Sequence, residues 1–201
     1  ENRLASIVAL VPAKFVLSEA NELFWFTRGN QQDTHQMSEE QVAALMTIRR
    51  ADSRDYDAIA DVMFDAVRHG PSAYTEAQRA AWLPSANSGA EWHQRLDEQA
   101  VFIAADPARI HGFMSLADDG TIDLAFIRPS AQGTGVFRRL YSEVENLALQ
   151  NRLPRLWLHA SLNAQSAFSA VGFVITQRES VELRGQSLER FMMEKQLPLG
   201  E

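Results

Sequence analysis

A short stretch with two glycines gives the first indication of chemistry. In Ile127 to Leu140, IRPSAQGTGVFRRL, an apolar run ends at a proline, two glycines follow, and a helical pattern begins at once. A strand that runs through such a turn into a helix presents unpaired backbone N–H groups at the positive end of the helix dipole. Glycine lets that backbone approach an anion without interference from a Cβ atom. The stretch therefore favours a phosphate or pyrophosphate guest on the amides from Gly133 to Phe137, and a tightly packed turn that binds nothing is the alternative.

Two familiar phosphate-binding motifs are excluded. The third small position of the dinucleotide fingerprint is occupied by Phe137, and the strands before the turn are predicted to be joined as hairpins. No Gly-Lys-Ser/Thr sequence follows, so the turn is not a P-loop. Phe137 begins the apolar stripe of the next helix, and we therefore expect its ring to lie in the core rather than over the turn.

Candidate acid–base side chains lie on two predicted strands. His159 and Ser161 share one face near the C-terminal end of a strand, and histidine exchanges protons near neutral pH. Asp123 lies on the preceding strand, where regular alternation would place it on the face of Ala125 and Ile127. Each candidate also has a structural interpretation. His159 and Ser161 would form a satisfied polar pair at a strand end, and Asp123 would be a solvated charge.

Other side chains with functional groups have weaker indications. Arginines on a helix surface are usually solvated, so we expect at most one of the three around the glycine turn to meet a phosphate; they are Arg128, Arg138 and Arg139. Three aromatic residues in or near predicted helices are expected to pack in the core: Tyr74, Trp82 and Tyr141. The five histidines have no ligand spacing and the carboxylates do not cluster, so no metal site is predicted.

The elements that would position these residues follow one another from Thr47. A short strand and helical segments come first, and three strands then form an antiparallel meander with a tight turn at Asp119-Gly120. The long helix ends at Gln150, and a fifth strand and a short helix capped by Asn163 follow it. Two long strands around Arg184-Gly185-Gln186 close the chain. This order predicts an α+β layered domain with a mixed, mostly antiparallel sheet.

The composition excludes several classes of protein. The chain has 201 residues, 46% of them hydrophobic, with a net charge of -7 and a pI near 5.3, so no nucleic-acid partner is predicted. It has no cysteine, which excludes disulfides and a cysteine nucleophile. No apolar run approaches the roughly 20 residues that span a bilayer. We therefore expect a soluble, cytoplasmic protein without a membrane partner.

The first 45 residues differ in their pattern of apolar and polar residues from the rest of the chain. They are apolar but interrupted, with the aromatic cluster Phe24, Trp25 and Phe26 before a polar stretch. Met46 would serve as a natural start of the readable pattern. Residues 1–45 are therefore expected to be an extension outside the core fold, and an arm docked onto the domain is the alternative.

Three segments in a fixed order resemble the GNAT superfamily of acyl-CoA-dependent N-acyltransferases, in particular a small bacterial branch. The superfamily pattern Q/R-x-x-G-x-G/A is matched except at its last position by Gln132-Gly133-Thr134-Gly135-Val136-Phe137. The block NAQSAFSAVGF, which begins at Asn163, is similar to the motif after the fifth strand, and the tail VELRGQSLERFMMEKQL is similar to the C-terminal hairpin of that branch. The resemblance covers residues 46–197.

The resemblance implies a site for acetyl-CoA as the acyl-donor cosubstrate, without a metal. The fourth strand would splay from the fifth and receive the pantetheine arm like an added strand. The pyrophosphate would lie on the glycine turn, and the thioester carbonyl would point at backbone N–H groups. The cofactor-binding residues implied are Phe126, Ile127, Gln132, Gly133, Thr134, Gly135, Val136, Phe137 and Asn163. The acetyl group would pass directly to an amine, without an acyl-enzyme.

One departure from the family pattern concerns the general acid. Many members have a tyrosine four residues before the Gly-Phe pair, and Phe168 stands at that position here. We predict an acetyl-CoA-dependent N-acyltransferase acting on a small-molecule or protein amine, with Asp123, His159 and Ser161 as catalytic candidates. A non-catalytic acyl-CoA-binding module and a plain interaction domain remain alternatives. The long C-terminal strands would also allow a homodimer.

Overall fold

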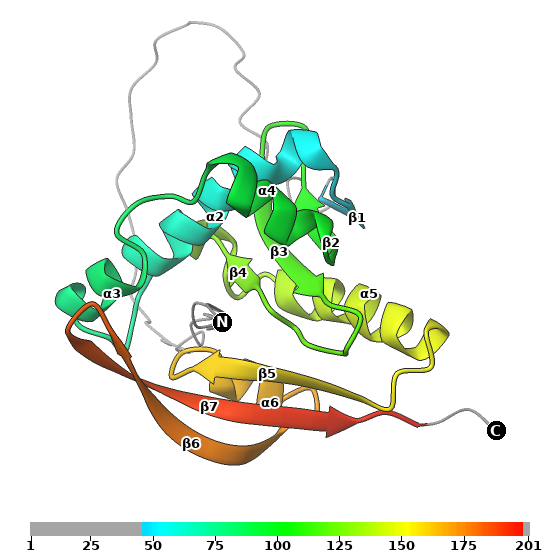
Figure 1. The fold of residues 1–201 in the computed structure, drawn as a ribbon. Coiled ribbons are helices and arrows are strands. Elements are labelled where there is room, and N and C mark those ends of the chain that lie inside the picture. The colour runs from blue at the N-terminus through cyan, green and yellow to red at the C-terminus, as the bar shows by residue number, and fades with distance from the viewer. Residues whose placement is uncertain (1–45, 199–201) are drawn as a thin grey trace, which may run out of the picture.

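The protein adopts an α+β fold in a computed structural model that describes residues 46–198 (Figure 1). The predicted α+β class with flanking helices is confirmed, and the strands form two antiparallel sheets. The predicted N-terminal extension, residues 1–45, lies outside the described residues.

The first sheet has the strand order β1-β2-β3-β4, with every pair antiparallel. Its strands are β1 (Thr47–Arg50), β2 (Ala100–Ala105), β3 (Ile110–Leu116) and β4 (Ala125–Ile127). The predicted tight turn after β3 is present. Gly120 has a φ of 86°, and the Ala117 amide donates to the Thr121 carbonyl at 2.9 Å. Glycine is favoured at this position because the left-handed conformation is strained for residues with a Cβ.

β4 is shorter than predicted because its pairing is interrupted before Ala125. The Leu124 amide donates to the Oγ of Ser115 at 3.0 Å rather than to a backbone carbonyl. Ile122 packs in the same core cluster as Ala125, although even spacing would place it with Leu124. Asp123 contacts the opposite side, that of helix α4. The expectation that Asp123 shares the face of Ala125 and Ile127 is therefore wrong, because the irregular backbone shifts the alternation by one residue.

The second sheet has the strand order β5-β7-β6, again antiparallel. Its strands are β5 (Arg155–Ser161), β6 (Val174–Leu183) and β7 (Gln186–Gln196). One parallel bridge, between Thr121 and Trp157, joins it to the first sheet. Within residues 46–198 no ladder continues from this bridge, and Figure 1 shows β4 and β5 running apart beyond it.

Helices cover both faces of the first sheet and bury two core clusters. They are α2 (Tyr56–Arg68), α3 (Glu76–Trp82), α4 (Gly89–Asp97), α5 (Val136–Gln150) and α6 (Gln165–Ser169), with short 3-10 turns η1 (Ser53–Asp55) and η2 (Pro129–Ala131). One cluster joins α5 and α6 to the sheets, and the other joins α2, α3 and α4 to the opposite face. The alternation of β2 shows the two faces: Ile103 packs in the second cluster and Phe102 in the first.

Candidate functional site

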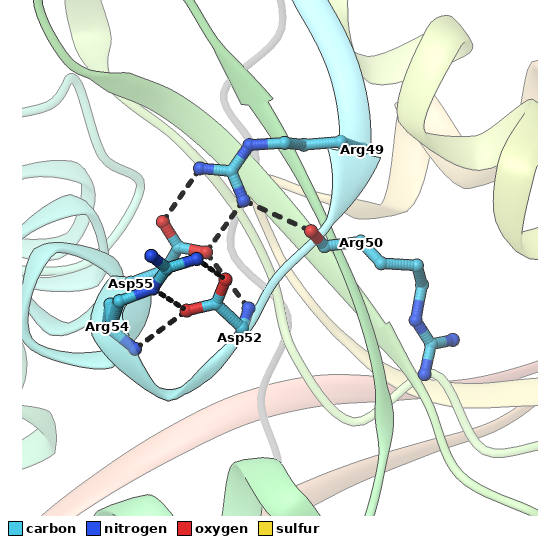
Figure 2. Close-up of a pocket in the computed structure, with 5 residues that line it drawn as sticks. All are labelled: Arg49, Arg50, Asp52, Arg54 and Asp55. Atoms are coloured by element: carbon cyan, nitrogen blue, oxygen red, sulfur yellow. Dashed lines mark hydrogen bonds and ion pairs between the residues drawn. The ribbon is translucent and has the colours of Figure 1, made fainter.

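Two hollows in the surface lie apart from the candidate residues. The first, of about 570 Å³, is lined by Arg49, Arg50, Asp52, Arg54 and Asp55 (Figure 2). Its charges pair with one another: Arg49 binds Asp55 at 2.7 Å, and Arg54 binds Asp52 at 2.7 Å. The second, of about 290 Å³, lies between β2 and α5 and is also lined by none of the candidates. The volume of these hollows therefore does not indicate where the candidate site lies.

The glycine turn adopts the backbone conformation that its residues suggest. Gly133 has a φ of 79° and Gly135 a φ of 84°, both in the left-handed region that favours glycine. A Cβ atom built on Gly135 would meet no atom of residues 46–198 within 4 Å, so this part of the chain leaves the space beside it open. Two side chains of the turn donate hydrogen bonds to backbone carbonyls that precede it. The Thr134 hydroxyl donates to the Ala131 carbonyl at 2.7 Å, and Gln132 Nε2 donates to the Ile127 carbonyl at 3.2 Å.

The backbone N–H groups of this turn have no acceptor in the described part of the chain. From Gly133 to Arg138 none is satisfied, and the first amide bonded across the turn is that of Arg139, which donates to the Gly135 carbonyl at 3.2 Å. The turn leads directly into α5, a helix of 15 residues. Such a row of free donors at a helix N-terminus is suited to bind an anion.

The ring of Phe137 lies against the core, as expected. It packs edge-to-face on Phe168 with ring centroids 5.1 Å apart, and it stacks on Tyr141 at 6.1 Å. The side chain of Val136 is also buried. At both positions only the backbone amide is therefore available to an anion on the turn.

The backbone of β4 has one open edge, which faces β5. The Ser115 amide donates to the Leu124 carbonyl, and the Arg128 amide donates to the His111 carbonyl, so even-numbered residues bond to β3. Amides alternate in direction along a strand, so that of Phe126 also faces β3, whereas those of Ala125 and Ile127 face the divergence from β5. Of the two backbone donors that were predicted together, Phe126 and Ile127, only the Ile127 amide therefore lies on the open edge.

Two of the three arginines near the turn have structural partners. Arg128 donates to the Ile110 carbonyl at 2.9 Å and to Asp65 at 3.0 Å. Arg139 donates to the Met46 carbonyl at 2.7 Å. Arg138 is exposed and has no partner among residues 46–198. It is therefore the arginine of the three that remains available to a ligand.

Asp123 is buried in an ion pair with α4, the helix that precedes β2. Both carboxylate oxygens accept from Arg95, at 2.8 and 2.9 Å, and Gln99 donates to one of them at 2.8 Å. These bonds attach the irregular start of β4 to α4. They give Asp123 a structural role, and its predicted role as a base stays a prediction.

His159 lies on the side of the second sheet that carries charged residues from β6 and β7. Its Nε2 is 3.2 Å from Oε1 of Glu179, and Nε of Arg190 donates to the same oxygen at 2.6 Å. Burial lowers the pKa of His159, and so does Arg190, while Glu179 opposes them. The ring is therefore neutral at neutral pH. Glu179 and Arg190 were not predicted as site residues, because the register of the two long strands cannot be read from their sequence.

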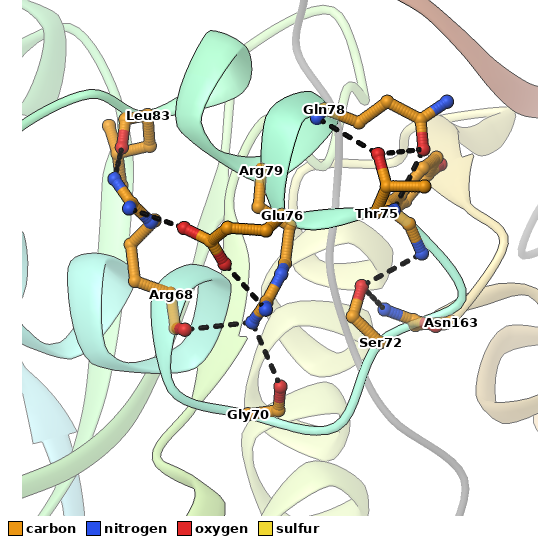
Figure 3. A network of polar contacts seen from close by, with 10 residues as sticks. Arg68, Gly70, Ser72, Thr75, Glu76, Gln78, Arg79, Leu83 and Asn163 are labelled. Atoms are coloured by element: carbon orange, nitrogen blue, oxygen red, sulfur yellow. Dashed lines mark hydrogen bonds and ion pairs between the residues drawn. The ribbon is translucent and has the colours of Figure 1, made fainter.

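The two polar residues after β5 hold loops in place. The Oγ of Ser161 accepts from the Ala164 amide at 3.2 Å, so it is Ser161 that satisfies the start of the α6 turn. The prediction that Asn163 caps this helix is wrong. Its Oδ1 accepts from the Ala73 amide at 2.8 Å, and its Nδ2 donates to Ser72 at 3.1 Å (Figure 3). Asn163 can make these bonds because the loop before α3 lies beside it.

The predicted packing aromatics are buried. Tyr74 packs edge-to-face on Trp82, its hydroxyl donates to the Glu189 carbonyl, and it accepts from the Leu162 amide at 3.1 Å. Burial raises the pKa of Tyr74 to about 12. Phe168 is fully buried in the core, which agrees with its predicted packing role.

Residues 46–198 contain neither a cluster of metal-ligating side chains nor a helix that could span a membrane. No group of three or more His, Asp or Glu side chains is placed to hold a metal ion. No helix of this region is long and apolar enough to cross a membrane.

Comparisons with known proteins place this geometry in a family. The family model described as "Acetyltransferase (GNAT) domain" matches residues 71–197. A GCN5-related N-acetyltransferase structure from Rhodopseudomonas palustris is 28% identical, with a TM-score of 0.68 over 75% of this chain and 95% of that one. No curated protein matches significantly.

Two more distant structures share the fold and contain acetyl-CoA. YncA, a putative acetyltransferase from Salmonella typhimurium solved with its cofactor acetyl-CoA, is 22% identical with a TM-score of 0.58, covering 78% of this chain and 96% of that one. A phosphinothricin acetyltransferase from Sinorhizobium meliloti in complex with AcCoA is 20% identical with a TM-score of 0.56, covering 76% and 89%. The glycine turn, the order of elements and the family match agree, and the chain belongs to the GNAT acetyltransferase family.

Proposed function

We propose that the protein transfers an acetyl group from acetyl-CoA directly to an amine. General acetyltransferase activity follows from the family, and the specific proposal concerns the donor, the route and the residues. The observation that carries it is the row of unsatisfied amides from Gly133 to Arg138 at the N-terminus of α5. A pyrophosphate is a dianionic ligand of suitable shape for such a row.

The donor would extend from the glycine turn along β4. The phosphates accept from the amides of the predicted residues Gly133 to Phe137, and Arg138 adds a charge-assisted contact. The pantetheine amides pair with the open edge of β4 at Ala125 and Ile127, as an added strand would. Asn163 supports this arrangement through the loop at Ser72 rather than by touching the donor.

The thioester carbonyl would be polarised by a backbone amide of β4. Of the two donors predicted, Phe126 and Ile127, the parity of the strand favours Ile127. A donor of this kind stabilises the oxyanion that forms when the amine attacks, and removing one such bond costs about 3 kcal/mol of transition-state stabilisation in mutational precedents.

His159 is the acid–base candidate that we favour. Its ring is neutral, it is half-buried, and its Nδ1 has no partner among the described residues. Asp123 is held by Arg95 and Ser161 caps a turn, so both would have to give up existing bonds to move a proton. With Phe168 in place of the usual tyrosine, CoA would leave as a thiolate, which a thiol pKa of about 8.5 allows.

Two alternatives differ in what happens after acetyl-CoA binds. A non-catalytic acyl-CoA-binding module is favoured by the absence of a hydroxyl at Phe168. An acetyltransferase for a protein lysine or N-terminus differs only in its acceptor. The homodimer, the cytoplasmic location and the domain bounds 46–197 are further proposals that accompany this function.

Calorimetric titration of acetyl-CoA into the full chain tests the donor site. We expect binding that weakens with dephospho-CoA and disappears with acetyl-pantetheine, which lacks the phosphates. Absence of binding at millimolar acetyl-CoA would contradict the proposal. Thiol release on a panel of small amines and lysine peptides then separates an enzyme from a binding module, and the preferred acceptor separates the two kinds of enzyme.

A further inference from the structure

Three strands bring a carboxylate, a guanidinium and an imidazole together on one face of the second sheet. Glu179 on β6 lies opposite Arg190 on β7, and Arg190 lies opposite Ser161 on β5. His159 follows the same alternation as Ser161, so it points to the same face. One oxygen of Glu179 accepts from Nε of Arg190 at 2.6 Å and lies 3.2 Å from Nε2 of His159.

The charge of Glu179, 3.2 Å from Nε2, favours one tautomer of the ring. An ionised carboxylate repels a lone pair and attracts an N–H group, so a proton on the nitrogen that faces Glu179 is the favoured arrangement. The lone pair of a neutral imidazole is then on Nδ1, and no group in residues 46–198 bonds to that atom of His159. A histidine in this state can accept a proton at Nδ1 without first changing its tautomer.

Two charged groups of residues 46–198 act on His159. Glu179 faces it from β6, and Arg190 faces it from β7. On its own strand the ring of Trp157 packs edge-to-face, with centroids 5.8 Å apart. Nε of Arg190 donates to Glu179, so one carboxylate oxygen lies between the charged guanidinium and the neutral imidazole.

His159 borders the divergence of the two sheets. The parallel bridge pairs Thr121 with Trp157, and Asp123 and His159 each follow it by two residues, where the strands run apart. Leu158 and Ala160 pack in the first core cluster, so His159 between them points away from it, toward the side on which Asp123 contacts α4. An amine that approaches a thioester on the open edge of β4 from this side would meet the imidazole.

We propose that Glu179, held by Arg190, positions His159 as the general base of the acetyl transfer. The inference rests on the proposed function. The amine nitrogen forms a bond to the thioester carbon, the amine proton passes to Nδ1 of His159, and the bond from carbon to sulfur breaks. CoA leaves as a thiolate, and the imidazolium returns its proton to the thiolate or to solvent. Glu179 touches no reacting atom and is a positioning residue.

The first test measures the charge coupling without catalysis. The pKa of His159 is read by NMR titration of the full chain, with His159→Gln to assign its signal. Glu179→Gln removes the charge that raises this pKa and is expected to lower it, whereas Arg190→Gln removes the charge that lowers it and is expected to raise it. Glu182→Gln, the same change on an exposed residue of the same strand, is expected to leave it unchanged.

The second test measures the acetyl transfer itself. Glu179→Gln should lower kcat by about 10- to 100-fold, as loss of an orienting carboxylate does at other histidines. It should leave the KM for acetyl-CoA unchanged and move the acidic limb of the kcat profile to lower pH. His159→Gln should lower kcat by about 100-fold or more and remove that limb.

Each outcome decides a different question. A pKa of His159 that does not respond to Glu179→Gln and Arg190→Gln overturns the coupling, whether or not the protein is active. Coupling without any effect on the pH limb overturns the role of His159 as base. Coupling in a protein that releases no thiol with any amine contradicts the proposed function instead. If Glu179→Gln does not fold, Arg190→Gln decides the coupling alone.

Discussion

Gly135 offers a sharp test of the anion site because the chain contains a matched control. Gly89 has a φ of 77°, close to the 84° of Gly135, and a Cβ on either residue would meet no atom of the described residues within 4 Å. Alanine in the left-handed region costs about 1 to 2 kcal/mol at either position. Gly135→Ala and Gly89→Ala should therefore destabilise the protein equally.

Only Gly135→Ala should weaken acetyl-CoA binding, because its methyl group would enter the space beside the free amides. We expect a loss of affinity of about tenfold or more, equivalent to about 1.4 kcal/mol. Gly135→Val should weaken binding further, since a β-branched side chain is larger at the same point. Equal acetyl-CoA affinities for Gly135→Ala and Gly89→Ala, measured by calorimetry, would remove the pyrophosphate from this turn.

Arg138 is predicted to contribute a salt-sensitive contact. Arg138→Ala should weaken acetyl-CoA binding by about tenfold at low salt, since charge-assisted contacts to phosphate are the strong ones but an exposed one is screened by ions. The difference from wild type should shrink as the salt concentration rises. Arg54→Ala, an exposed arginine paired with Asp52 in the hollow of Figure 2, provides the control. A loss that does not depend on salt would assign Arg138 a structural role.

At the residue scale the sequence predicts the chemistry of the backbone better than that of the side chains. The glycine turn was predictable because glycine spacing and the helix pattern specify a local geometry. The partners of Asp123 and His159 were not, because Arg95 lies 28 residues from Asp123 and Glu179 lies 20 residues from His159 in the chain. Only the register of distant strands and helices brings such pairs together.

Helices α3 and α4 differ in whether a side chain caps the free N–H groups of the first turn, which permits a paired test of capping. Thr75 and Gln78 form a reciprocal capping box at α3 (Figure 3), whereas Ser88 at the N-cap of α4 makes no side-chain cap bond. Thr75→Ala should lower the free energy of unfolding by about 1 kcal/mol, and Ser88→Ala by a few tenths at most. Urea unfolding of the two variants checks this, and equal losses would contradict the cap.

The order of elements was predictable, and the interruption of β4 was not. Alternating patterns and turn residues identify β2, β3 and the turn at Gly120, because each is a local signal. The irregularity at Asp123 depends on Ser115, whose hydroxyl replaces a carbonyl as the acceptor from Leu124. That replacement occurs between strands, so the sequence TIDLAFI reads as a regular strand although only its last three residues form one.

The divergence of β4 and β5 is a property of the whole molecule. Packing of α2 to α4 on one face and of α5 with α6 on the other keeps the two sheets together, although the strands share one bridge. Tyr74 adds a polar link across this assembly, since its hydroxyl joins the loop before α3 to the end of β5 and to β7. Tyr74→Phe would remove the partner of a partly buried amide and of a partly buried carbonyl, so we expect a loss of about 1 to 3 kcal/mol in the free energy of unfolding at neutral pH.

The raised pKa of Tyr74 also determines how the stability of the protein changes at alkaline pH. Tyr56 and Tyr74 both have a pKa raised to about 12, with burial as the main cause, and an unfolded tyrosine titrates near about 10. Between these values the unfolded chain binds fewer protons than the folded one, so stability falls as pH rises. Each such tyrosine contributes a slope of up to about 1.4 kcal/mol per pH unit. Tyr74→Phe should therefore be less stable at neutral pH and yet lose stability less steeply above about pH 10. Denaturant unfolding measured across that range checks both, and an unchanged slope would show that the Tyr74 hydroxyl does not stay protonated in the folded protein.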